Sequence, residues 1–180
     1  KLNNKTIDFS QPPKLKATLE ISEITPTVKL PDGYTASYTN NDIELKELAK
    51  YVTSISLKES GFNVTVNNNL PAVADNKISL TMSSSFLGMA STTNEFAAGS
   101  TTATPVFYKG TVQTDKAITD STKMDIFAEI GLPDYDPVEK TITVHNVAPD
   151  HTYGIEIQVD PVFDWTEATV KLPDNAANRN

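Results

Sequence analysis

Six stretches of this chain alternate apolar and polar residues with a period of two, and no other feature constrains the fold as strongly. They are KLKATLEIS (14–22), FNVTVN (62–67), KISLTMS (77–83), KMDIFAEI (123–130), TITVH (141–145) and YGIEIQVD (153–160). Successive side chains of a strand point to opposite faces, so this alternation predicts antiparallel sheets with one buried and one solvated face. The chain is expected to be all-β.

The number of short strands favours an antiparallel immunoglobulin-like β-sandwich. Turn signals such as Pro31-Asp32-Gly33 and Glu59-Ser60-Gly61 separate the alternating stretches, and further strands are predicted near 5–9 and 166–172. A chain of 180 residues is long enough for two small sandwiches or one large one. We expect two sandwiches in tandem, and one large β-sandwich is the alternative.

Residues 84–104 are the best candidate for a domain boundary. This segment is rich in small and hydroxylated residues and loses the alternation, so it is read as a boundary or a long loop. It would separate a module at 1–90 from a module at 103–174. Residues 1–90 carry no net charge, so the second module is acidic and holds the chain's net charge of −8.

One segment departs from strand spacing. In NDIELKELAKY the apolar residues Ile43, Leu45, Leu48 and Tyr51 follow helical spacing more closely than strand spacing. Asn41 or Asp42 would serve as the N-cap. One short helix is therefore predicted near 42–51.

Composition excludes several classes of function. The chain has no cysteine, so disulfides, thiolate metal sites and cysteine nucleophiles are excluded. The negative net charge and a single arginine, Arg179, disfavour nucleic acid as a partner. No apolar run approaches the length of a membrane span, so no transmembrane segment is expected.

Composition also favours an exported protein. Thr, Ser and Asn together account for 50 of the 180 residues, a bias typical of exposed sheets and loops of exported proteins. The sequence begins at Lys1 without a methionine, which suits the removal of a leader. We expect an extracellular, cell-surface or periplasmic location, with a lipid anchor attached upstream of Lys1.

No catalytic motif stands out. The two histidines, His145 and His151, flank the turn NVAPD without zinc-site spacing, and no serine lies in a nucleophile elbow. Carboxylates are abundant, but none has an apolar setting that would raise its pKa. We expect a protein that is not an enzyme and needs no cofactor. The alternative is an accessory domain of a glycan-processing enzyme or a carboxylate-dependent hydrolase.

Two acidic loops are weak candidates for calcium binding. Asp134 and Asp136 lie in GLPDYDP, and Asp160 and Asp164 lie in VDPVFDW. Calcium binds such carboxylates when several loops bring them together. Nothing matches the twelve-residue EF-hand pattern, so a solvated acidic surface is the simpler interpretation.

Aromatic residues near the second acidic loop are candidates for ligand binding. In this strand Thr166 and Ala168 are expected to point inward, so Trp165 is expected to lie on the solvated face. With Phe163, Tyr135 and Tyr153, it would form a platform for sugar rings or a protein contact. The alternative is a bulge at Pro161 that changes the register and brings Trp165 into the core.

The Thr/Asn-rich strands FNVTVNNNLP, KISLTMSSSF and TITVHNVAPD resemble β-sandwich modules of exported or surface-anchored bacterial lipoproteins. The resemblance is architectural and covers most of the chain, and no functional residue can be carried over from it. It implies a binding or structural module that recognises a glycan or protein partner at the cell surface.

Overall fold

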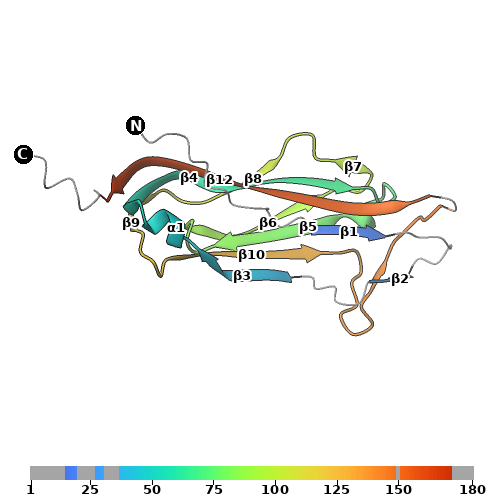
Figure 1. The fold of residues 1–180 in the computed structure, drawn as a ribbon. Coiled ribbons are helices and arrows are strands. Elements are labelled where there is room, and N and C mark those ends of the chain that lie inside the picture. The colour runs from blue at the N-terminus through green and yellow to red at the C-terminus, as the bar shows by residue number, and fades with distance from the viewer. Residues whose placement is uncertain (1–14, 20–26, 31–36, 149–150, 172–180) are drawn as a thin grey trace, which may run out of the picture.

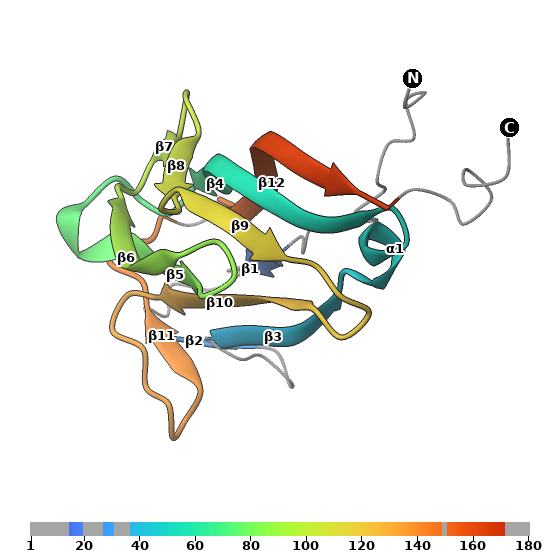
Figure 2. The same ribbon diagram turned by 90° about the vertical axis from the view of Figure 1, so that its left-hand side faces the viewer.

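The computed structural model describes residues 15–19, 27–30, 37–148 and 151–171. Two antiparallel sheets pack face to face, with a short helix, α1 (Lys46–Ala49), near one end (Figures 1 and 2). This confirms the all-β sandwich and the presence of one short helix. The strand predicted at 5–9 lies outside the described residues.

In each large sheet, four strands follow one another in a continuous hydrogen-bonded order. The first sheet consists of β1 (Leu15–Leu19), β12 (Tyr153–Val170), β4 (Val52–Asn68), β7 (Ser100–Thr101), β8 (Val106–Lys109) and β9 (Gln113–Ala117). The second sheet has the order β3 (Ser37–Glu44), β10 (Lys123–Gly131), β5 (Ile78–Ser84) and β6 (Met89–Phe96). A small third sheet pairs β2 (Thr27–Lys29) with β11 (Thr141–Thr143). A 3-10 turn, η1 (Ala74–Asn76), precedes β5.

Strands from both halves of the chain share the same sheets. The late strand β12 pairs with β4, and β10 lies between β3 and β5. Within residues 84–104, Phe86 and Leu87 are buried in the same hydrophobic cluster as the strands, and β6 takes up the centre of the segment. The described residues thus form one sandwich, which was the alternative expectation, and the sheets do not divide between 1–90 and 103–174.

The helix is shorter than the sequence predicts. Residues 42–44 belong to β3, where Ile43 lies opposite Met124 and Glu44 lies opposite Lys123 of β10. Backbone pairing with β10 therefore takes up the start of the predicted helix at 42–51. Leu45 follows as an N-cap without a side-chain hydrogen bond, and only one turn of helix forms.

Two predicted breaks turn out to be bulges in long strands. β4 has 17 residues and runs through the predicted turn at 59–61, while β12 has 18 residues and runs through Pro161. The register slips where Val162 faces Gly61 and Asp164 faces Lys58. There the Ser60 hydroxyl donates to the Asp164 carbonyl oxygen at 3.2 Å and lies 3.3 Å from the Asp164 backbone nitrogen. The two irregularities therefore meet in space.

Tyr108 ties the two sheets together through the core. It lies on β8, is 1% exposed, and donates its hydroxyl to the carbonyl oxygen of Leu80 on β5 at 2.8 Å. Burial raises the pKa of the Tyr108 phenol. The backbone of β4 passes close by, since a Cβ added to Gly61 would lie 2.0 Å from the Tyr108 carbonyl oxygen. Glycine is therefore required at this crossing.

Removing the hydroxyl of Tyr108 should destabilise the fold. In Tyr108→Phe the carbonyl oxygen of Leu80 loses a buried donor, which should lower the free energy of unfolding by about 1–3 kcal/mol. Urea unfolding followed by circular dichroism measures the change. The matched control is Tyr51→Phe, since Tyr51 is 53% exposed. Equal stability of the two variants would contradict the role of the Tyr108 hydroxyl.

Candidate ligand-binding pocket

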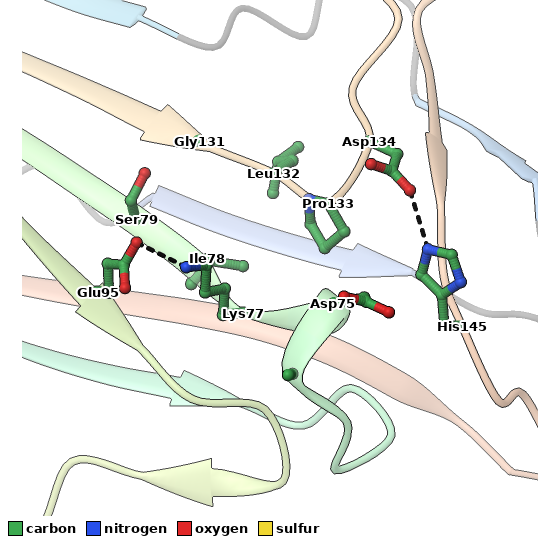
Figure 3. A pocket seen from close by; sticks show the side chains of 11 residues that line it. Asp75, Lys77, Ile78, Ser79, Glu95, Gly131, Leu132, Pro133, Asp134 and His145 are labelled. Carbon is green, nitrogen blue, oxygen red and sulfur yellow. Dashed lines mark hydrogen bonds and ion pairs between the residues drawn. The ribbon is translucent and has the colours of Figure 1, made fainter.

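A hollow of about 460 Å³ opens beside the second sheet, where β5 begins and β10 ends (Figure 3). Its walls come from η1, β5, β6, the segment after β10 and the segment after β11. The lining residues are Ala74, Asp75, Lys77, Ile78, Ser79, Glu95, Gly131, Leu132, Pro133, Asp134 and His145. Most of the side chains that can form hydrogen bonds here are charged, so the pocket suits a polar ligand.

A histidine–carboxylate hydrogen bond and a lysine–glutamate ion pair lie on different walls of the pocket, as Figure 3 shows. His145 Nε2 lies 2.9 Å from Asp134 Oδ2, and Lys77 Nζ lies 2.9 Å from Glu95 Oε1. All four side chains are at least 38% exposed, so the pairs themselves add little stability. Each carboxylate keeps a second oxygen that can accept a hydrogen bond from a ligand.

Asn76, which is fully buried, positions one wall of the pocket. Its side-chain oxygen accepts a hydrogen bond from the backbone N–H of His145 at 2.8 Å, and its amide donates to the His145 carbonyl oxygen at 2.8 Å. The amide also donates to the Pro71 carbonyl oxygen at 2.9 Å. Asn76 thus fixes the backbone of His145 against η1.

A second buried amide, Asn68, supports the first. It donates to the carbonyl oxygens of Asn76 at 3.1 Å and Phe96 at 3.2 Å. Neither amide was predicted from the sequence. The alternation does indicate that Asn68 points inward, because Asn68 follows Val64 and Val66 at the same spacing of two residues.

Replacing Asn76 should weaken the fold far more than replacing the half-buried Asn67. Asn76→Ala leaves three backbone groups without their partner and should cost about 2–4 kcal/mol. The control is Asn67→Ala, which removes an exposed hydrogen bond with the Thr101 hydroxyl and should cost less than about 1 kcal/mol. Urea unfolding compares the two variants. Equal costs would show that the network does not hold this wall.

The structure does not gather the four aspartates proposed for calcium. Asp134 lies at the pocket, and Asp136 is used locally, because its carboxylate accepts hydrogen bonds from the backbone N–H groups of Val138 and Glu139. Asp160 and Asp164 lie on β12 instead. Among the described residues no group of three or more His, Asp or Glu side chains is arranged to hold a metal ion.

The four aromatic candidates have different environments. Tyr153 is buried and its hydroxyl accepts the backbone N–H of Ala148 at 3.1 Å, so it belongs to the core. Tyr135 and Phe163 are half-buried against that core. Trp165 is 44% exposed. The role of these residues in ligand binding stays a prediction.

The sequence left two alternatives for Trp165, a position on the solvated face or a bulge that brings it into the core, and the structure combines parts of both. The register slips between Trp165 and Glu167, and Trp165 lies directly opposite Leu57, which is buried. Residues directly opposite each other on paired strands share a face. A bulge therefore does turn Trp165 toward the core side, but after Trp165 rather than at Pro161, and the side chain remains exposed.

Asp125, one of the two carboxylates on β10, has a structural role. Its two oxygens accept hydrogen bonds from the backbone N–H groups of Ser85 and Phe86, both at 2.8 Å. Lys116 of β9 donates to the Phe86 carbonyl oxygen, and its ammonium lies 4.5 Å from the centre of the Phe86 ring. Burial lowers the pKa of Lys116, and the charge of Asp125 opposes this change. The turn between β5 and β6 is thus held by both sheets.

The Asp125 carboxylate should make stability depend on pH. Partial burial acts to raise its pKa, but the hydrogen bonds from Ser85 and Phe86 outweigh burial and hold the pKa below its ordinary value. Because the folded pKa lies below the unfolded one, the stabilisation is present above about pH 4 and is lost as the pH falls through the folded pKa.

We therefore expect Asp125→Asn to be less stable than the wild type near pH 7, with the gap closing below about pH 4. Thermal unfolding measured from pH 7 to pH 3 tests this. Glu129→Gln removes an exposed carboxylate from the same strand and should show no such gap. A gap that stays constant down to pH 3 would contradict the assignment.

Comparisons with known proteins give little further information. No family model matches the chain, and no curated protein matches it. One solved structure, described as the empty head of turnip yellow mosaic virus, shares 12% identity, covers 92% of this chain and 87% of that chain, and has a TM-score of 0.33. A likeness this low carries no argument about fold or function. No helix in the described ranges is long and apolar enough to cross a membrane.

Proposed function

We propose that this chain is a non-catalytic binding or structural module of the cell envelope or extracellular space, and that its pocket recognises a glycan. The observation that carries the proposal is the open polar pocket that holds Asp134 and His145 on one wall and Lys77 and Glu95 on another. The bias toward Thr, Ser and Asn supports the location.

A hydroxyl-rich ligand fits this pocket better than an ionic one. Asp134 lies 2.9 Å from His145, and Glu95 lies 2.9 Å from Lys77, so donors and acceptors stand side by side in the pocket. Sugar hydroxyls both donate and accept, and can bond the second oxygens of these carboxylates as well as the Lys77 ammonium. The pocket's volume of about 460 Å³ lies within the ordinary range for small-ligand sites.

The proposal is tested by isothermal titration of the full chain with a panel of neutral hexose oligosaccharides. At least one should bind, and Asp134→Asn should weaken its affinity about tenfold, which corresponds to about 1.4 kcal/mol. Asn is a suitable replacement because Asp134 has a φ of 40°, and asparagine tolerates the left-handed region. His145→Gln should weaken binding similarly.

Matched controls change the same residue types away from the pocket. Asp120→Asn removes an exposed aspartate from the loop before β10, and His151→Gln replaces the other histidine. Both should bind like the wild type. If no oligosaccharide binds, or if the pocket variants bind as tightly as the controls, the glycan proposal is wrong.

A further inference from the structure

The charges that line the pocket do not cancel. Asp75, Glu95 and Asp134 contribute three carboxylates, and Lys77 contributes one ammonium. His145 adds a positive charge only when it is protonated. The three carboxylates are exposed, and exposed Asp and Glu side chains are ionised at pH 7. The lining is therefore net negative whether or not the histidine is protonated.

The two polar contacts in the pocket balance charge to different extents. Lys77 Nζ lies 2.9 Å from Glu95 Oε1, so an ammonium and a carboxylate cancel on that wall. On the other wall, Asp134 Oδ2 lies 2.9 Å from His145 Nε2. A neutral imidazole can donate this hydrogen bond without removing the charge of the carboxylate. The wall that holds Asp134 therefore keeps a negative charge when His145 is neutral.

A further carboxylate comes to the pocket beside the His145 wall. Asp75 lines the pocket from η1 (Figure 3). The next residue, Asn76, bonds both the backbone N–H and the backbone carbonyl oxygen of His145 at 2.8 Å, and so holds η1 against that wall. Asp75 and Asp134 thus belong to separate elements that both meet at His145. Together they make this side of the pocket the one that attracts a cation.

The charge of the whole chain acts in the same direction. The chain carries a net charge of −8, and residues 91–180, which include Glu95, Asp134 and His145, contain six basic and fourteen acidic residues. A field of this sign attracts cations and repels anions. A ligand with a positive group therefore meets a favourable field both on its approach and inside the pocket.

We propose that the pocket prefers amino sugars, in which a ring carries a free ammonium group, to neutral sugars of the same linkage. This inference rests on the proposed function and names the class of glycan. The ligand keeps the hydroxyl groups that bond to Lys77 and Glu95, and its ammonium binds the carboxylates of Asp75 and Asp134. An ammonium has three donors, and its attraction to a carboxylate adds to the hydrogen bond.

Isothermal titration with matched sugars tests the preference. The full chain is titrated with oligosaccharides of glucose and of galactose, with glucosamine and galactosamine oligosaccharides of the same linkage and length, and with the N-acetylated forms of the latter. In low salt the free amino sugar should bind about fivefold to tenfold more tightly than both neutral partners. About 1 M salt should remove most of this difference, because salt screens exposed charges.

Two pocket variants should move the preference in opposite directions. Asp75→Asn removes a carboxylate, so the ratio of amino-sugar to neutral-sugar affinity should fall about threefold. Lys77→Gln removes the ammonium but keeps a donor, so the same ratio should rise about threefold. A variant that merely disturbed the pocket would weaken the binding of both sugars and would not raise the ratio.

The control variants make the same changes away from the pocket. Asp120→Asn removes an exposed carboxylate from the loop before β10. Lys109→Gln removes an ammonium that is paired with Glu59 at 3.3 Å on the first sheet. Both controls should leave the ratio of affinities unchanged.

The outcomes separate this inference from the proposed function. If neutral sugars bind as tightly as amino sugars, or if the pocket variants leave the ratio unchanged, the amino-sugar preference is wrong while the glycan proposal stands. If no sugar of either kind binds, both are wrong. Tetralysine carries ammonium groups without sugar hydroxyls and should bind more weakly than the amino sugar. Equal or tighter binding of tetralysine would overturn the inference and identify a cationic peptide as the ligand.

Discussion

The fold depends on the pairing of β4 with β12. This ladder joins residues about a hundred positions apart and extends from the pair of Ile155 with Asn68 to the pair of Val170 with Val52. β4 also carries β7, β8 and β9 on its other side, so most of the first sheet is assembled on one strand. This sheet can form only after its last strand is available. Closing so long a loop costs conformational entropy before the two strands can pair.

Polar groups inside the sandwich determine local geometry that packing alone leaves open. Asn76 connects η1 to the segment after β11 that carries His145, and Asp125 holds the turn that follows β5. Hydrophobic burial is nearly indifferent to small shifts of a backbone, whereas a hydrogen bond is directional and is expensive to leave unmade when buried. The wall of the pocket that holds His145 therefore rests on two buried amides, Asn76 and Asn68.

The alternation of the sequence was sufficient to predict the class of fold and most strands, because a strand with one buried face has apolar residues at every second position. The alternation was not sufficient to predict the topology, because nothing in the sequence of β10 indicates that β3 and β5 are its neighbours in the sheet. It also missed the pocket, whose residues come from separate elements. Glu59-Ser60-Gly61 was misread as a turn because a bulge uses the same small or polar residues as a hairpin.

The bulges near Ser60 and Trp165 have a consequence for the shape of the molecule. A bulged pair of strands twists more strongly than a regular one, and the register of β12 on β4 slips at three places between Val162 and Val170. The half of β12 beyond Val162 is therefore expected to twist more strongly against β4 than the half before it. A single-residue deletion in either strand would reverse the phase of every side chain beyond it, so this twist is encoded by residue spacing rather than by residue type.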